Sequence, residues 1–227
     1  MSPTFNIDSL RKKGKKPSIV ASVIPSRDIE DQVERLSRKM DLFNFIPEIR
    51  MDLVKKVPIG YLENYFSTLS QTGINCIFTF RANTIEEAEE PYEEALMYEN
   101  TIIDVDTSII NAIDMEKSKK RMIISSHFQN FLEFRSRSVE LFAIRDCAVK
   151  LATSFDQLSF TEALWYMTQI KGERIFSLVP QGSENREMRV VSAIQISDFT
   201  YSFFEEPVAP GQYSLDQIHN IMDAIFP

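Results

Sequence analysis

The sequence predicts an α/β protein, a (β/α)8 TIM barrel in which residues 1–227 form a single domain, and three observations carry that prediction. Short apolar segments rich in β-branched residues recur at fairly even spacing, and amphipathic helical patterns lie between them. Most of these segments are apolar on both faces, which is typical of parallel strands buried under helices. A barrel commonly takes about 200 to 250 residues as one unit, and no linker divides this chain. An open doubly wound sheet gives the same local pattern and remains the alternative fold.

Eight segments have the length and composition of buried strands. Each is short and enriched in β-branched or aromatic residues, and polar residues follow it. The expected strands, in chain order, are Ser18–Val23, Glu48–Asp52, Cys76–Phe80, Thr101–Asp106, Arg121–Ser126, Cys147–Ala152, Arg174–Leu178 and Asp198–Tyr201.

Segments with helical periodicity lie between most of these strands. Apolar residues spaced three and four apart define stretches that can cover the outside of a sheet. Glycine follows two of the stretches, at Gly73 and Gly172, where a helix commonly ends in a left-handed residue. The expected helices are Ile29–Lys39, Tyr61–Gln71, Ile85–Tyr98, Gln129–Arg137, Phe160–Gln169 and Leu215–Ile225.

The charge balance excludes nucleic acid as the main ligand. The chain has 25 lysines and arginines against 33 aspartates and glutamates, a formal net charge of -8 and a sequence pI near 5.0. A nucleic-acid-binding domain needs a basic surface that neutralises phosphates. The one basic cluster, Arg11–Lys16, is interpreted as part of a solvated basic N-terminal arm over residues 1–16.

Cysteine use and hydropathy indicate a cytoplasmic protein that does not bind membranes. The two cysteines, Cys76 and Cys147, both lie in apolar runs and are expected to be reduced core residues. No apolar stretch approaches the roughly 20 residues of a transmembrane helix, and no signal-peptide pattern follows the first charges.

The sequence contains no recognisable motif for binding a nucleotide or a metal ion. Its six glycines lie far apart, so neither a G-x-G-x-x-G turn nor a P-loop can be written. The two histidines, His127 and His219, are also far apart, and there is no C-x-x-C or H-E-x-x-H motif. We therefore expect a cofactor-free and metal-free chemistry on a small-molecule substrate.

Polar residues interrupt the expected strands at or near their carboxyl ends. In Glu48–Asp52 a period of two puts three charges on one face and Ile49 and Met51 on the other, although a half-exposed edge strand would read the same way. Because the carboxyl ends of barrel strands meet at one mouth, where the active sites of this fold lie, these charges are expected to meet. The other interruptions are Thr79, Arg81, Asp104, Asp106, His127 and Lys150.

Lys150 is the candidate nucleophile. Its neighbours Ala148, Val149, Leu151 and Ala152 are apolar, so an interior position would desolvate its amine and favour the neutral form that attacks carbonyls. A lysine that snorkels from a strand edge is the alternative. His127, one strand earlier, is placed to move protons, although a histidine hydrogen-bonded in a loop fits the local sequence equally well.

The order of these motifs resembles type I 3-dehydroquinate dehydratase, the Schiff-base-forming enzyme of the shikimate pathway of aromatic amino acid biosynthesis. The resemblance runs from about residue 18 to the C-terminus. It rests on Glu48-Ile49-Arg50-Met51-Asp52, Thr79-Phe80-Arg81, Asp104-Val105-Asp106, Ile124-Ser125-Ser126-His127, Val149-Lys150-Leu151-Ala152 and Ala209-Pro210-Gly211-Gln212. It implies a barrel that dehydrates 3-dehydroquinate to 3-dehydroshikimate without metal or nucleotide.

The resemblance also implies a role for each matching residue. Lys150 would form the Schiff base and His127 would transfer protons. The residues that would hold the substrate are Glu48, Arg50, Arg81 and, in a loop that closes over the site, Gln212.

Four features depart from the pattern of that family. The arginine for the substrate carboxylate is Arg189 when counted back from Gln212 and Arg186 when counted forward from Gly182, and we prefer Arg189. The acid that partners the histidine is expected to be Glu86, with Glu87 as the alternative. Val208 replaces a serine before Ala-Pro-Gly-Gln, and the family's D-x-E ends here in an aspartate, Asp106.

Two other functions fit the same residues. A class I aldolase-type barrel could use Lys150 on a sugar phosphate, although no glycine-based phosphate site is evident. A catalytically silent barrel that serves as a binding protein is the second alternative, which the combination of Lys150 and His127 argues against. Exposed apolar residues in the late helices are compatible with a homodimer.

Overall fold

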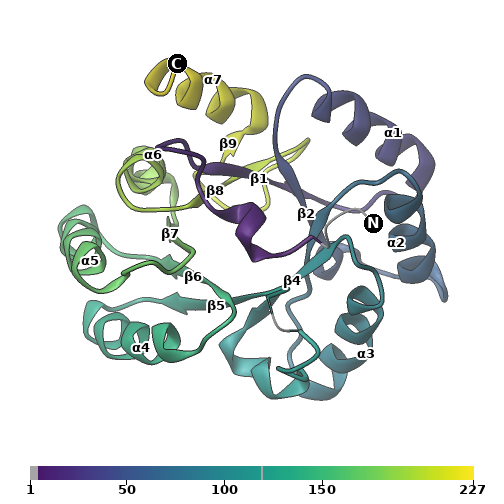
Figure 1. The fold of residues 1–227 in the computed structure, drawn as a ribbon, viewed down its shortest axis with the longest axis horizontal. Coiled ribbons are helices and arrows are strands. Elements are labelled where there is room, and N and C mark those ends of the chain that lie inside the picture. Colours follow the sequence, from purple (N-terminus) through teal and green to yellow (C-terminus); the bar gives the residue numbers. More distant parts are fainter. Residues whose placement is uncertain (1–4, 119) are drawn as a thin grey trace.

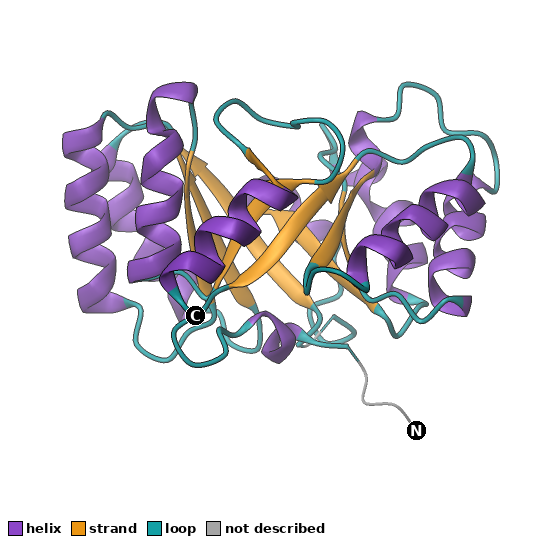
Figure 2. Cartoon of the chain, turned by 90° about the horizontal axis from the view of Figure 1, so that it is seen from above, coloured by secondary structure: helices purple, strands orange, loops and turns teal. Residues whose placement is uncertain are grey.

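The structure, a computed structural model, describes residues 5–118 and 120–227 and is built on parallel strands surrounded by helices (Figures 1 and 2). All eight predicted strands overlap observed strands, with bounds that differ by no more than two residues at either end. The strands are β1 (Ser18–Val23), β2 (Ile46–Arg50), β3 (Cys76–Thr79), β4 (Thr101–Asp106), β5 (Met122–Phe128), β6 (Ala148–Thr153), β7 (Phe176–Pro180), β8 (Phe199–Phe203) and a short β9 (Tyr213–Ser214).

All strand pairs are parallel, and the pairing order is β7-β6-β5-β4-β3-β2-β1-β8-β9. The curled sheet returns on itself, because β7 and β8 also lie side by side. At this seam the Asp198 backbone N–H donates to the Phe176 carbonyl at 2.7 Å, and the Phe176 N–H donates to the Asp198 carboxylate at 3.2 Å. The predicted α/β barrel is therefore confirmed.

Helices follow most of the strands and form the outer layer in Figure 1. A 3-10 helix, η3 (Thr107–Ala112), takes the place of the α-helix between β4 and β5. Helix α6 is not among the predicted helices. The α-helices are α1 (Ile29–Met40), α2 (Tyr61–Gln71), α3 (Ile85–Leu96), α4 (Phe131–Ala143), α5 (Gln157–Ile170), α6 (Arg186–Gln195) and α7 (Leu215–Ile225).

Strand alternation divides the core into two layers. Ile49 of β2 points outward and is fully buried against the helices, whereas its neighbour Glu48 points into the barrel. Toward the amino ends of the strands the barrel interior is apolar and includes Val20, Ile77 and Ile123. Toward their carboxyl ends the interior is polar, and the charged side chains of the strands gather there.

The N-terminal segment closes the opposite end of the barrel. Phe5, Ile7 and Leu10 are buried in the interior apolar cluster, and the short helix η1 (Ile7–Leu10) crosses the ring of strands in Figure 1. The basic residues that follow are largely exposed, but Lys16 pairs with Asp223 of α7. Residues 5–10 are thus a plug rather than a solvated arm, because three apolar side chains are buried there; residues 1–4 of the predicted arm lie outside the described residues.

No helix in the described part of the chain is long and apolar enough to cross a membrane.

Candidate active site

The pairing of β5 and β6 brings the two candidate catalytic residues to one wall of the barrel. Lys150 pairs with Ser125, and Ala152 pairs with His127, two residues further along both strands. Since side chains alternate along a strand, Lys150 and His127 both point inward, with His127 nearer the mouth. Strand β5 continues to Phe128, beyond its predicted end at Ser126, and therefore includes the histidine.

Lys150 is buried, with 8% of its surface exposed. Its Nζ lies 2.7 Å from Asp104 Oδ2 and 3.3 Å from Glu48 Oε1. The same nitrogen lies 3.9 Å from the centre of the Tyr201 ring, a cation–π arrangement. The alternative of a lysine that snorkels from a strand edge is therefore wrong.

The surroundings of Lys150 also change the expected cause of its reactivity. Two buried carboxylates and an aromatic face contact the amine, in addition to the apolar neighbours that the sequence shows. The amine therefore lies in a polar, hydrogen-bonded setting and not in a purely apolar one. An ammonium must lose a proton before it can attack a carbonyl. The Nζ of Lys150 donates a hydrogen bond to Asp104 at 2.7 Å.

Glu48 is held as an ionised carboxylate. Its Oε2 accepts a hydrogen bond from Ser22 Oγ at 2.6 Å, and its Oε1 accepts one from Thr79 Oγ1 at 2.9 Å. Burial acts to raise the pKa of Glu48, but the charges of Lys150 and Arg50 outweigh it and hold the pKa below its usual value. The two hydroxyls thus fix an anion beside the lysine.

Arg81 connects the carboxylates at the carboxyl end of β4. Its guanidinium donates to Ser125 Oγ at 2.8 Å and to Asp104 Oδ1 at 3.2 Å, and it lies 3.8 Å from Asp106. Asp104 is fully buried, and burial would raise its pKa. The pKa of Asp104 is nevertheless held well below its usual value, because Lys150 and Arg81 stabilise the anion.

Arg50 lies at the carboxyl end of β2 and is paired with a neighbour in the chain. Its Nε and one terminal nitrogen donate to the two carboxylate oxygens of Asp52, at 2.9 and 2.7 Å. Glu48, Arg50 and Asp52 were predicted to share one face, and the first two line the same cavity as Lys150.

The structure gives His127 a different carboxylate from the predicted one. His127 Nδ1 lies 3.2 Å from Asp106 Oδ2. Glu86 is exposed in the first turn of α3, where it hydrogen-bonds with Thr84, and Glu87 accepts a hydrogen bond from the Asn83 backbone. The prediction of Glu86 followed from its distance after Arg81 in the chain, but helix α3 begins there and directs both glutamates to its own N-terminal turn.

Arg189 and Arg186 occupy different surroundings, one helical turn apart on α6. Arg189 is 4% exposed and lines the cavity; one of its terminal nitrogens donates to the Pro210 carbonyl at 3.3 Å, and its Nε has no partner. Burial lowers the pKa of Arg189 to about 10. Arg186 lies outside that cavity, with its guanidinium 4.2 Å from the centre of the Tyr213 ring and hydrogen-bonded to Gln217.

The loop between β8 and β9 covers the cavity and is held by Gln212. Gln212 Oε1 accepts hydrogen bonds from the backbone N–H groups of Val208 and Ala209, and its Nε2 lies 3.5 Å from Ser22 Oγ. Gly211 has a φ of +76°, and a Cβ there would lie 2.3 Å from the Gly182 carbonyl oxygen. The loop therefore contacts the segment after β7 directly, and only glycine allows this approach.

These side chains enclose a cavity of about 350 Å³ at the carboxyl ends of the strands. The predicted residues that line it are Glu48, Arg50, Arg81, His127, Lys150, Arg189 and Gln212, and Val208 also contributes. Arg50, Arg81 and Lys150 each have a carboxylate partner. Among the residues that the structure describes, Arg189 is the lining cation without one, so it is suited to an anionic group of a ligand.

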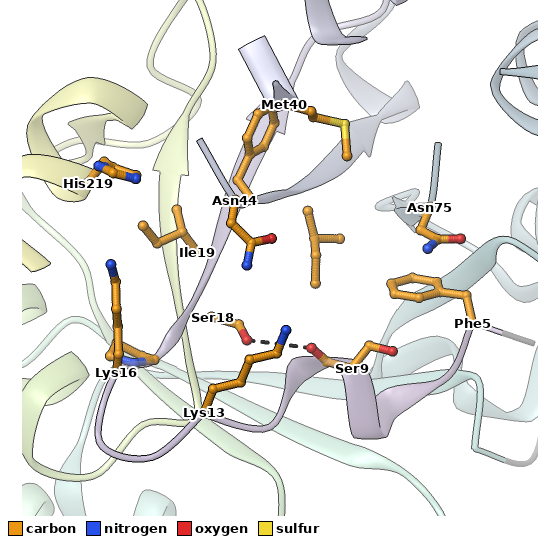
Figure 3. Close-up of a pocket in the computed structure, with 13 residues that line it drawn as sticks. Phe5, Ser9, Lys13, Lys16, Ser18, Ile19, Met40, Asn44, Asn75 and His219 are labelled. Atoms are coloured by element: carbon orange, nitrogen blue, oxygen red, sulfur yellow. Dashed lines mark hydrogen bonds between the residues drawn. The ribbon is translucent and has the colours of Figure 1, made fainter. Parts of the chain in front are cut away.

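A second cavity, of about 370 Å³, lies at the amino ends of β1 and β2 (Figure 3). Its buried lining residues, among them Phe5, Ile19 and Phe45, are apolar. Its lysines stand at the rim, where Lys13 is exposed and Lys16 pairs with Asp223. The buried combination of a lysine, carboxylates and a nearby histidine belongs to the first cavity.

Sequence reasoning missed three side chains of the first cavity and its surroundings. Asp106 was noted as a charge at a strand end and as a shortened family residue but was given no role, although alternation with Asp104 places it on the inner face beside β5. Ser22 and Tyr201 gave no signal, because a serine or tyrosine in an apolar strand reads as core. Their roles follow from positions on other strands and not from their own neighbours in the sequence.

Two curated relatives match the chain over most of its length. The 3-dehydroquinate dehydratase of Thermoplasma volcanium is 26% identical over 215 residues, covering 93% of this chain and 90% of that protein. The 3-dehydroquinate dehydratase of Thermoplasma acidophilum is 26% identical over 213 residues, with 92% and 91% covered. No family model matches the chain.

Solved structures share the fold at lower identity. The type I 3-dehydroquinate dehydratase of Clostridium difficile, which carries covalently modified comenic acid, superposes with a TM-score of 0.77 at 20% identity, covering 95% of this chain and 94% of that one. The 3-dehydroquinate dehydratase of Geobacillus kaustophilus gives a TM-score of 0.73 at 16% identity, with 98% of both chains covered. The predicted resemblance is thus confirmed, in sequence by the two relatives and in fold by these structures.

Proposed function

We propose that this chain is a type I 3-dehydroquinate dehydratase, which eliminates water from 3-dehydroquinate to give 3-dehydroshikimate in the shikimate pathway. The observation that carries the proposal is the buried Lys150 in a cavity that it shares with His127 and the unpaired Arg189. A ketone that also carries a carboxylate would meet an amine, an imidazole and a free guanidinium there. The names of the curated relatives support the same substrate.

Formation of the covalent intermediate begins at the amine. Lys150 attacks as the neutral amine, so the proton of its ammonium form must first be released to solvent. The neutral amine adds to the C3 ketone, and the resulting carbinolamine loses water to give an iminium ion. The iminium withdraws electrons more strongly than the ketone, so the adjacent C2 proton becomes acidic.

Elimination then requires one base that can return its proton. His127 removes the C2 proton and leaves an enamine, which expels the C1 hydroxyl as His127 returns the proton to form water. Such proton transfer by a positioned side chain is typically worth about 10²- to 10⁴-fold in rate. Water hydrolyses the conjugated iminium, which releases 3-dehydroshikimate and restores Lys150.

The other lining residues would orient a polyhydroxylated ring. Glu48, Arg50 and Arg81 supply matched acceptors and donors, and each is already held by a partner, so binding requires little rearrangement. Gln212 would close the site from the β8–β9 loop. Val208 supplies no hydroxyl at the position where the family has a serine.

Turnover of 3-dehydroquinate tests the proposal directly. The purified chain is incubated with 3-dehydroquinate, and the conjugated enone product is followed by its ultraviolet absorbance. We expect turnover without added metal or nucleotide, and none with a ketose phosphate offered under the same conditions. Turnover of the sugar phosphate instead would favour an aldolase, and inertness toward both would favour a binding protein.

Arg189 is proposed to bind the substrate carboxylate. We expect Arg189→Ala to raise the KM for 3-dehydroquinate by about 10- to 100-fold, since a hydrogen-bonded charged contact is worth roughly 1.5–3 kcal/mol. The matched control is Arg186→Ala on the same helix, which should change KM by less than about 3-fold. If Arg186→Ala raised KM and Arg189→Ala did not, the two assignments would be exchanged.

We also propose a homodimer formed through the outer faces of α4 and α5, which are neighbours in Figure 1. Leu132 and Val139 of α4, and Leu158 and Trp165 of α5, are 79%, 53%, 73% and 68% exposed. Each pair is spaced seven residues apart, so the four side chains lie on one side of the helix pair, the α4–α5 apolar surface. A second copy of the chain would bury this surface.

Trp165→Glu is expected to convert the dimer into a monomer, because it replaces a large side chain of the apolar surface with a charge. Light scattering coupled to size-exclusion chromatography measures the mass. Leu42→Glu, which changes an equally exposed residue outside this surface, should leave the dimer intact. A wild-type protein that remains a monomer at high micromolar concentration would contradict the proposal.

A cytoplasmic location is part of the same proposal. Both cysteines, Cys76 and Cys147, are free and buried, which suits a reducing compartment.

A further inference from the structure

We propose that Asp106 is the positioning residue that fixes the tautomer and orientation of His127. This inference rests on the proposed function, because it assigns a role within the same site. In an elimination the histidine acts as a base, so the ring nitrogen that faces the substrate must be unprotonated. The imidazole ring must also be held in the right orientation.

The carboxylate of Asp106 is fixed by its own backbone surroundings. Asp106 is the N-cap of η3, and its Oδ1 accepts hydrogen bonds from the Ser108 backbone N–H at 2.9 Å and from Ser108 Oγ at 2.8 Å. These two bonds set the rotation of the carboxylate. Its second oxygen, Oδ2, then points to His127 Nδ1 at 3.2 Å.

Asp106 remains ionised over the working range of an enzyme. Burial acts to raise its pKa, but hydrogen bonds from His127 and Ser108 and the charge of Arg81 lower the pKa to about 2. An ionised carboxylate only accepts hydrogen bonds. The neutral imidazole must therefore carry its proton on Nδ1, which leaves the lone pair on Nε2.

The other charged residues near His127 have different partners, so none of those that the structure describes takes the place of Asp106 beside the imidazole. Arg81 lies 3.8 Å from its carboxylate and points its guanidinium mainly at Asp104 and Ser125. Arg137 of α4 reaches Thr107, the residue after Asp106, at 3.5 Å. Glu86 and Glu87 are exposed and bonded within the N-terminal turn of α3.

The strand register explains why a side chain as short as that of Asp106 can reach His127. Asp106 pairs with Ser125 on β5, and His127 is the next inward-pointing residue of that strand. The histidine therefore stands one layer above Asp106 on the adjacent strand, within reach of a short side chain. The residue that the family resemblance marks as a shortened carboxylate becomes the partner of the base.

Three variants of the full chain test the proposal by kinetics. Asp106→Asn has the same shape but can donate its amide to Nδ1, so it favours the tautomer with the proton on Nε2. We expect its kcat to fall by about 10²-fold or more while KM changes by less than about 3-fold. Asp106→Glu restores an ionised acceptor and should recover at least about 10-fold of that loss. Asp114→Asn alters an exposed aspartate whose carboxylate also accepts a backbone hydrogen bond, from Glu116, and should leave kcat unchanged.

A second measurement reports on the imidazole without requiring turnover. Nitrogen-15 NMR of histidine-labelled protein distinguishes the two tautomers of the neutral imidazole when it is recorded at the upper end of a pH series, where the nitrogen shifts no longer change. His127→Gln assigns the signal against that of His219. We expect the proton on Nδ1 in the wild type and a shift toward Nε2 in Asp106→Asn.

The outcomes separate the two proposals. An unchanged kcat in Asp106→Asn, or a wild-type imidazole protonated on Nε2, would overturn the role of Asp106 even if the enzyme is active. Failure of the wild type to turn over 3-dehydroquinate would overturn the proposed function, and the NMR result would still decide which nitrogen of His127 carries the proton beside Asp106.

Discussion

Replacement of Lys150 by alanine is expected to lower the turnover of 3-dehydroquinate by about 10⁴-fold or more, since the variant has no amine for the covalent intermediate. The same variant should form no adduct when substrate and borohydride are added together. The measurement is the initial rate of enone formation, with the mass of the intact protein recorded after borohydride treatment.

The Lys150→Ala substitution is expected to lower the stability of the fold as well as to remove the nucleophile. Loss of Lys150 removes the cation that Glu48 and Asp104 share and leaves Asp104 with Arg81 alone. Removing one partner of a buried ion pair costs about 3 to 5 kcal/mol. Lys150→Arg keeps a positive charge but offers no nucleophilic amine, so it should be inactive and more stable than Lys150→Ala. The matched control is Lys171→Arg, at the end of α5, which should be fully active. Turnover by Lys150→Arg within about tenfold of the wild type would rule out the Schiff base.

Replacement of His127 by alanine is expected to lower kcat by about 10²- to 10⁴-fold while the covalent adduct still forms. The reason is that Lys150 keeps its partners Asp104 and Glu48, whereas the C2 proton loses its base. Borohydride should therefore trap the adduct of the substrate, which is heavier by one water molecule than the adduct of the product.

The second histidine of the chain provides the control for this prediction. His219 of α7 contacts Asp223 and the Phe43 ring, outside the cavity of Lys150. His219→Ala should therefore leave kcat unchanged. An active His127→Ala variant that traps the product adduct as the wild type does would show that another group moves the proton.

The strands and most of the helices could be predicted because they depend on local patterns. The apolar run Thr101–Asp106 is the observed β4, and Gly73 follows helix α2 as expected. The position of Lys150 on an interior strand followed from its apolar neighbours in the same way. The polar residues at the strand ends were expected to meet, and the barrel topology brings them together.

Features that depend on contacts between distant segments could not be predicted. The carboxylates beside Lys150 come from β2 and β4. The residues next to Lys150 in the sequence therefore indicate that its amine is buried, but they do not show the carboxylates that face it. The burial of Phe5 and Leu10 depends on the open end of a barrel that exists only after folding. Helix α6 was missed because Gly182, Ser183 and Asn185 have the composition of a loop, and they form the turn before it.

Trapping the intermediate at Lys150 tests the central claim most directly. The wild-type chain is incubated with 3-dehydroquinate, reduced with borohydride and digested with trypsin, which cleaves after unmodified lysine and arginine. Cleavage at Lys150 separates residues 146–150 from 151–171, so a modified Lys150 should give the joined peptide 146–171 with the mass of the reduced adduct. Full cleavage after Lys150 in a protein that turns over the substrate, or an adduct on another lysine, would contradict the account.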